Sequence, residues 1–212
     1  MKKILFLIVL MLGLVSCGTP KEIALPNKNL KNENGVITFK GKPYTGKLKA
    51  NLADKVQGYQ GALSLKDGHF EGLSEIKSEK QKMHVKFTVK DGKFDGEVIS
   101  QVPQMGETNI IFKDGKLVSE KLKLTNGMTS DLTYTPEGVI NGTMEMSGQT
   151  FNFKDGVAEF PQGKMIAKID YEKQVLFMTV MQGDTVIQKI EQPMLTVSMF
   201  EKMLFPVLTQ YQ

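Results

Sequence analysis

The stretch that decides the fold is VKFTVKDGKFDGEV, residues 85–98. Two alternating runs flank Asp91-Gly92, and a type I′ hairpin turn needs positive φ at both central residues, which Asp-Gly tolerates. With that turn, one face of the hairpin carries three pairs: Val89 with Phe94, Phe87 with Gly96, and Val85 with Val98. The opposite face is wholly polar, so a slip of one residue would mix the two faces. The segment therefore predicts an antiparallel hairpin with a defined register.

The same hairpin pattern recurs along most of the chain. The predicted turns and their first two pairs are Gly41-Lys42 (Phe39 with Tyr44, Ile37 with Gly46), Asp67-Gly68 (Leu65 with Phe70, Leu63 with Gly72, extending to Tyr59 with Ile76), Asp114-Gly115 (Phe112 with Leu117, Ile110 with Ser119), 136–138 (Tyr134 with Ile140, Leu132 with Gly142) and Asp155-Gly156 (Phe153 with Ala158, Phe151 with Phe160). A period near 23 residues indicates repeated supersecondary units that bury their faces against neighbours. A glycine opposite a bulky side chain is expected to let that side chain lie across the strand.

The strings Gly92-Lys93-Phe94-Asp95-Gly96 and Gly68-His69-Phe70-Glu71-Gly72 resemble the bacterial variant of the MORN repeat. Residues 41–46 are a looser match, and the resemblance covers roughly residues 35–160, weakening towards its end. It implies interaction rather than catalysis. Some members of this repeat group carry a toxin-antitoxin label, which fits an exported chain poorly.

The end of the chain changes pattern. Residues 164–190 alternate, with a hairpin expected at Gly183-Asp184, whereas apolar residues between 194 and 205 have helical spacing. Pro206 is expected to end or kink this helix. We interpret the helix as a cap on the last open edge of the sheet, and docking on a membrane or partner is the alternative. The fold class is mainly β: tandem antiparallel hairpin repeats forming an elongated meander sheet with a C-terminal capping helix.

The N-terminus is typical of an exported protein. Lys2 and Lys3 precede an apolar run, 4–15, that is too short to span a bilayer. The string Leu14-Val15-Ser16-Cys17-Gly18 resembles the lipobox of bacterial lipoproteins. The resemblance implies cleavage before Cys17 and lipidation of that residue, and Gly18 in place of aspartate implies the outer membrane.

Four segments are therefore expected: a signal peptide (1–16), the lipidated cysteine with a flexible tether (17–34), the repeat domain (35–192) and the C-terminal helix (193–212). The tether is predicted from its polar, proline-containing composition. Removal of the signal peptide takes two lysines with it and lowers the formal charge from +4 to +2.

Composition disfavours several functions. All 27 basic residues of the 212 are lysine, so no guanidinium is present for bidentate phosphate recognition, and a nucleic-acid partner is not expected. A single cysteine excludes an intrachain disulfide and a thiolate metal cluster.

No motif indicates catalysis, and no catalytic, cofactor-binding or metal-binding residue is predicted. His69 and His84 lack neighbours at ligand spacing and are expected to be solvated. The turn aspartates are interpreted as structural because aspartate tolerates left-handed backbone. Five methionines of the weaker repeats are interpreted as core residues: Met144, Met146, Met165, Met178 and Met181.

The sequence thus predicts a lipid-anchored cell-envelope module that binds a protein or an envelope polymer, or has a structural role, and is not an enzyme. The alternatives are a periplasmic small-ligand carrier, an envelope enzyme with an unrecognised site, and a toxin-antitoxin component.

Overall fold

A computed structural model describes residues 19–51 and 58–210. Within those ranges the chain forms 20 strands and one helix, which confirms the mainly β class. Thirteen strands build one large sheet: β1 (Glu22–Leu25), β5 (Gly46–Asn51), β6 (Gln60–Lys66), β7 (His69–Phe70), β8 (Gly72–Ser78), β9 (Met83–Lys90), β10 (Lys93–Phe94), β11 (Gly96–Val102), β12 (Gly106–Lys113), β13 (Lys116–Leu124), β14 (Thr129–Tyr134), β15 (Ile140–Met146) and β16 (Gln149–Phe153). From β5 onward, neighbouring strands follow one another in chain order and pair antiparallel.

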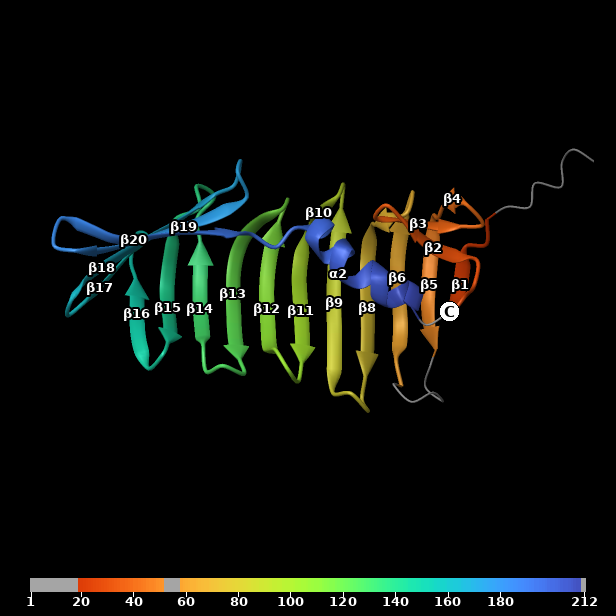
Figure 1. Cartoon of the computed structure of the whole chain (residues 1–212), viewed down its shortest axis with the longest axis horizontal. Coiled ribbons are helices and arrows are strands. Elements are labelled where there is room, and N and C mark those ends of the chain that lie inside the picture. Colours follow the sequence, from red (N-terminus) through yellow and green to blue (C-terminus); the bar gives the residue numbers. More distant parts are fainter. Residues whose placement is uncertain (1–18, 52–57, 211–212) are drawn as a thin grey trace, which may run out of the picture.

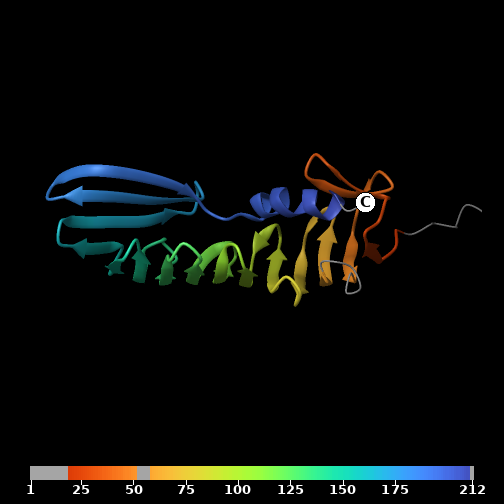
Figure 2. The ribbon, with the colours of Figure 1, turned by 60° about the horizontal axis from the view of Figure 1, so that its bottom comes forward.

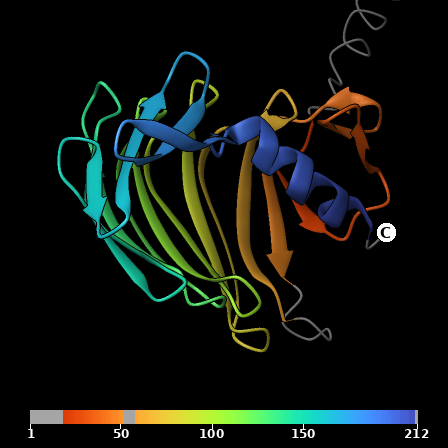
Figure 3. The same cartoon turned by 60° about the vertical axis from the view of Figure 1, so that its left-hand side comes forward.

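Three smaller units complete the fold. They are a sheet of β2 (Leu30–Glu33), β3 (Val36–Phe39) and β4 (Lys42–Pro43), a sheet of β17 (Val157–Phe160), β18 (Gly163–Asp170), β19 (Val175–Gln182) and β20 (Thr185–Pro193), and the helix α2 (Val197–Gln210). Figure 1 shows the large sheet as a long row of strands, and Figure 2 shows all three units on one of its faces. Figure 3 shows the curvature of the strands beneath them. We call this side the covered face and the other side the open face.

The predicted hairpin turns form, with one correction. The turn residues Asp67, Asp91, Asp114 and Asp155 have φ between 50° and 52°, and each is followed by a glycine of positive φ. The first hairpin, however, turns at Lys40-Gly41 rather than Gly41-Lys42, because these two residues have the positive φ values. Phe39 consequently pairs with Lys42, and its predicted pairing with Tyr44 is wrong.

The predicted register holds close to each Asp-Gly turn and then shifts. Phe94 pairs with Val89 as predicted, but Val85 pairs with Ser100 instead of Val98. The shift occurs where Asp95 leaves the ladder, its N–H bonding the carbonyl of Thr88 at 3.0 Å. Because the shift is two residues, the two faces do not mix.

The neighbouring hairpins deviate in related ways. Leu65 pairs with Phe70 as predicted, but Ile76 pairs with Gly61 instead of Tyr59, again a two-residue shift. In the fourth hairpin a bulge pairs Ile110 with Glu120 instead of Ser119. The fifth follows the prediction, with Tyr134 opposite Ile140 and Leu132 opposite Gly142.

Gly96 has a different role from the predicted one. It pairs with Phe112 of the next strand rather than with Phe87, and a Cβ built on it would meet nothing within 4 Å. Its φ of +98° is a conformation that other residues rarely adopt. The irregular backbone after this turn, and not space for an aromatic ring, therefore requires this glycine.

Successive repeats are joined by side chains that precede the second glycine of each motif. These side chains accept the backbone N–H of the next turn aspartate: Thr45 from Asp67 at 2.8 Å, Glu71 from Asp91 at 3.1 Å, Asp95 from Asp114 at 3.2 Å, and Asn141 from Asp155 at 2.8 Å. The residue types differ, but each supplies an oxygen acceptor. The sequence pattern alone did not reveal these contacts between repeats.

The sixth predicted hairpin does not continue the large sheet. Only a Lys154–Val157 bridge keeps the expected register, after which β17 folds back as part of the second sheet. The rings of Phe151 and Phe160 still meet, 5.7 Å apart. They pack edge to face between two sheets because the chain reverses over the covered face.

The predicted flexible tether is largely structured. Residues 22–25 form β1, which pairs parallel with β5 and buries Ile23 and Leu25. Residues 30–33 form β2, where Leu30 is 1% exposed. In these strands single apolar residues alternate with polar ones, so a segment that is polar as a whole still has residues to bury.

The C-terminal helix is confirmed, but its place is different. It lies across the covered face and contacts β2 and β7, not the final edge of the sheet. Its N-cap is Thr196, whose hydroxyl accepts the N–H of Met199 at 3.2 Å. Pro206 lies inside the helix instead of ending it.

Two hydrophobic cores lie under these units. The larger is aromatic, and in it Phe200 and Phe205 of the helix meet Phe87 and Phe70 with ring centroids 4.9 Å apart in each pair. The second lies between β14–β16 and the β17–β20 sheet and includes Phe153, which is 6% exposed. Hence α2 and the β2–β4 sheet cover one half of this face, and the β17–β20 sheet covers the other.

Candidate functional site

The open face of the large sheet is a broad surface that no other described element covers (Figure 2). Its central row takes one residue from each of ten strands, β5, β6, β8, β9 and β11 to β16: Lys49, Ala62, Glu75, Lys86, Ile99, Asn109, Lys121, Asp131, Thr143 and Asn152. All but Ala62 and Ile99 are polar. Each alternates along its strand with residues of the covered face, so the strand period of two positions the whole row.

Short polar contacts order the open face. His84 Nε2 lies 2.9 Å from Glu75 Oε1, and Lys121 Nζ lies 3.1 Å from Asp131 Oδ2. Both pairs join adjacent strands. Exposed ion pairs of this kind contribute only about 0–1 kcal/mol each to stability. Their main effect is to fix which polar groups the open face presents.

Amide side chains continue the pattern. Asn109 donates to Glu97 at 3.0 Å, and Thr143 donates to Asn152 at 3.0 Å. A groove of about 280 Å³ crosses β11, β12 and β13, and residues of both faces of the sheet line it: Ile99, Ser100, Gln101, Glu107, Thr108, Asn109, Lys121, Leu122 and Lys123. Six of these belong to the open face by strand alternation: Ile99, Gln101, Glu107, Asn109, Lys121 and Lys123. The surface thus combines donors, acceptors and few apolar groups.

A second polar group lies on the covered face, between the two cores. The bulge in β13 turns Glu120 inward, where it accepts hydrogen bonds from Ser130, at 3.1 Å, and from Tyr134. Burial raises the pKa of the Glu120 carboxyl, and the two hydrogen bonds oppose that shift. Burial and the nearby Glu120 charge raise the pKa of Tyr134. Sequence reasoning missed this cluster because the predicted register placed Ser119 inward.

A small cleft lies near this cluster, under the segment that connects β20 to α2. Its volume is about 190 Å³, and Phe94, Lys116, Tyr171 and the segment 194–197 are among its lining residues. Tyr171 donates to the carbonyl of Leu117 at 3.0 Å. Glu120 is not among the lining residues, so no buried carboxylate faces the cleft.

The two histidines both have carboxylate partners. His84 contacts Glu75 as described above, and His69 Nδ1 lies 3.2 Å from Oε2 of Glu201. His69 pairs with Lys66 beside the Asp67-Gly68 turn, and its contact with the helix was not predicted from the sequence. Among the described residues, no group of three or more His, Cys, Asp or Glu side chains could hold a metal ion.

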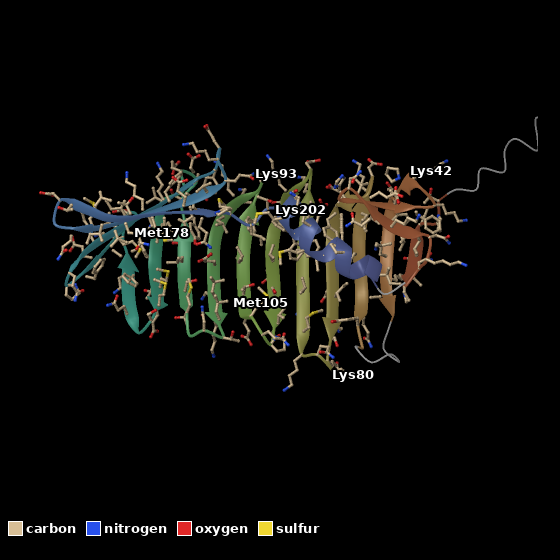
Figure 4. The ribbon with its side chains drawn as sticks, viewed as in Figure 1. Lys42, Lys80, Lys93, Met105, Met178 and Lys202 are labelled. Atoms are coloured by element: carbon tan, nitrogen blue, oxygen red, sulfur yellow. The ribbon has the colours of Figure 1, made fainter. Side chains whose placement is uncertain are left out.

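The methionines follow the core interpretation in part. Met144 and Met165 are 7% and 5% exposed, and Met178 packs on the same core (Figure 4). Met146 is 41% exposed, and Met181 is half-buried.

Further lysines lie outside the open face. Lys42, in β4, and Lys93, in β10, follow hairpin turns on one side of the row of strands, and Lys80 lies at the opposite strand ends (Figure 4). Lys202 lies on the outer side of α2 and is exposed.

The predicted lipidation site, Cys17, lies outside the described residues. A search of the described residues finds no helix with the length and apolar character needed to cross a membrane. Comparisons with family models, with curated proteins and with solved structures found no match for this chain.

Proposed function

We propose that this chain is a lipid-anchored cell-envelope protein that binds a protein or an envelope polymer through the open face of its large sheet, without catalysis. The observation that carries the proposal is the asymmetry of the sheet. Three units cover one face, whereas no described element covers the other (Figure 2). Extended repeat sheets of this kind offer long binding surfaces.

The chemistry of the open face indicates the kind of partner. Its charges are paired across strands, as in Lys121 with Asp131, and amides such as Asn109 add donors and acceptors. Only scattered apolar side chains are present, for example Ile111, which is 41% exposed. A polar partner bound through many hydrogen bonds fits this surface better than a lipid or an apolar helix.

The lipobox-like string supports anchoring at Cys17. The first strand begins at Glu22, so four residues, 18–21, separate the cysteine from the sheet. Four extended residues span at most about 14 Å. The anchor would therefore hold the β1 end of the sheet near the lipid headgroups.

Site-specific photo-crosslinking in cells tests the binding surface. A crosslinking residue at Asn109 or Thr143 is expected to trap the same partner, and one at Lys202, on the outside of α2, is expected not to. Equal capture from all three positions, or capture from Lys202 alone, would exclude the open face as the binding surface.

Detergent-phase partitioning tests the anchor separately. Cys17→Ser is expected to move the protein from the detergent phase to the aqueous phase. Unchanged partitioning would remove the lipoprotein assignment without bearing on the binding surface.

A further inference from the structure

The four-stranded sheet, called the small sheet below, ends at β20, whose outer edge is unpaired. It pairs with β19 on one side, and no described strand pairs with its other side. At nine residues β20 is longer than the other sheet-edge strands β1, β16 and β17, which have four, five and four residues. Such an edge presents a row of free backbone N–H and C=O groups to another strand.

The side chains of β20 are as open as its backbone. Eight of its nine residues are exposed, among them Val186 at 45% and Ile187 at 60%. Ile190 alone is half-buried. Figure 2 shows this strand in the part of the small sheet farthest from the large sheet, so neither layer shields it.

The charges on β20 are self-complementary. Lys189 and Glu191 are two residues apart and lie opposite Thr179 and Phe177 of β19, so they share one face. Neither forms an ion pair within the part of the chain that the structure describes. A lone lysine on an edge strand discourages pairing, whereas Lys-x-Glu matches an antiparallel copy of itself.

We propose that β20 pairs antiparallel with β20 of a second copy of this chain, about a two-fold axis through Ile190. This register places Lys189 opposite the partner's Glu191, and Glu191 opposite the partner's Lys189. Gln188 meets the partner's Gln192, and the two half-buried Ile190 side chains meet each other. Both copies use the same surface, as a closed two-fold interface requires. The two four-stranded sheets join into one sheet of eight strands.

The position of the edge is compatible with anchoring. β20 lies at one end of the molecule, and β1, which follows residue 19 closely in the sequence, lies at the other end (Figure 1). The open face of the large sheet remains free in such a pair.

Charge reversal tests the register in solution. Lys189→Glu and Glu191→Lys each place like charges opposite in a self-pair, so each is expected to weaken dimerisation of the full chain in detergent roughly tenfold or more. A one-to-one mixture of the two variants restores opposite charges at both positions and is expected to form heterodimers. Lys123→Glu, on an exposed position of β13 with the same change in charge, is the control.

Sedimentation velocity over a concentration series measures these outcomes. A monomeric wild-type chain across the series, unchanged dimerisation of both variants, or failure of the mixture to recover would overturn the proposal. Recovery in the mixture also shows that the single variants are folded.

Disulfide trapping in cells provides an independent test. Ile190→Cys places two thiols opposite each other across the two-fold axis, and facing residues in antiparallel pairs have Cα distances that a disulfide can bridge. Ile190→Cys is expected to give a covalent dimer in a Cys17→Ser background, whereas Thr185→Cys, which has no thiol opposite, is not. Equal crosslinking of both variants, or none from Ile190→Cys, would contradict the register.

Discussion

The carboxylate of Glu201 accepts the backbone N–H of Phe70 at 2.8 Å, across 131 residues of sequence. Its other oxygen lies 3.2 Å from His69 Nδ1, and the side chain belongs to a residue that is only 6% exposed. One acidic residue therefore fixes α2 on the second hairpin. Helical spacing predicts the apolar stripe of α2, but not that an acid within the stripe is its anchor.

Glu201→Ala should lower the free energy of unfolding by about 1–3 kcal/mol. The substitution removes the carboxylate that accepts the buried N–H of Phe70, and the described residues give that N–H no other acceptor. Glu201→Gln keeps one acceptor oxygen and should lose less. Urea unfolding measures both, with Lys202→Ala, at the exposed neighbour, as control. Equal losses from Glu201→Ala and Lys202→Ala would contradict the anchoring role.

Alanine substitutions at two glycines distinguish the stability lost to a strained backbone from the stability lost to a steric clash. Gly96 and Gly106 have φ of +98° and +108°, but only at Gly106 would a Cβ overlap the carbonyl oxygen of Lys123. Gly96→Ala should cost roughly 1–2 kcal/mol for its backbone. Gly106→Ala should cost roughly 1–3 kcal/mol more. Thermal unfolding of the two variants side by side measures the difference, and equal melting temperatures would show that the strand yields at Gly106.

The contacts between repeats require an acceptor rather than a charge. Asp95→Ala should lower stability by about 1 kcal/mol because the N–H of Asp114 loses its acceptor. Asp95→Asn should retain most of that stability, since Asn141 occupies the equivalent position two repeats later. Chemical unfolding distinguishes the two variants. A larger loss from Asp95→Asn than from Asp95→Ala would show that charge, not hydrogen bonding, joins the repeats.

The inward carboxyl of Glu120 should give stability a distinct pH dependence. Burial raises its folded-state pKa, with the hydrogen bonds from Ser130 and Tyr134 opposing the shift. At pH values between the unfolded-state and folded-state pKa of Glu120, the folded chain therefore binds more protons than the unfolded chain. The resulting stabilisation is fully present below the unfolded-state pKa and is lost as the pH rises through the folded-state pKa. Glu120→Gln should flatten this decline in melting temperature, whereas Glu145→Gln on the open face should not. Parallel pH profiles for Glu120→Gln and the wild type would contradict the assignment.

Local chemistry explains which parts of the fold could be predicted. Asp-Gly turns and the pairs beside them, such as Phe94 with Val89, depend on a few adjacent residues and are confirmed. The shifts that follow depend on the next strand, because Gly96 pairs with Phe112 and not within its own hairpin. The alternating pattern survives a two-residue shift, so the composition of each face was predictable where the exact partners were not.

Long-range packing explains the rest. The chain reversal after Lys154 and the position of Phe205 depend on contacts between distant segments, which no local pattern contains. The polar row of the open face follows from strand alternation once the register is known. The inward turn of Glu120 could have been found only from the bulge, which has no glycine or proline to mark it.

The return of α2 to the first repeats has a consequence for the order of folding. A repeat protein can usually fold progressively as its chain emerges, because each unit contacts only its neighbours. Here Phe70 and Phe87 lack the rings that α2 packs on them until Phe200 and Phe205 are made. The first repeats are therefore incomplete for nearly the whole of synthesis, and their apolar face is exposed to other chains during that time. The last residues made are the ones that finish the first part of the core.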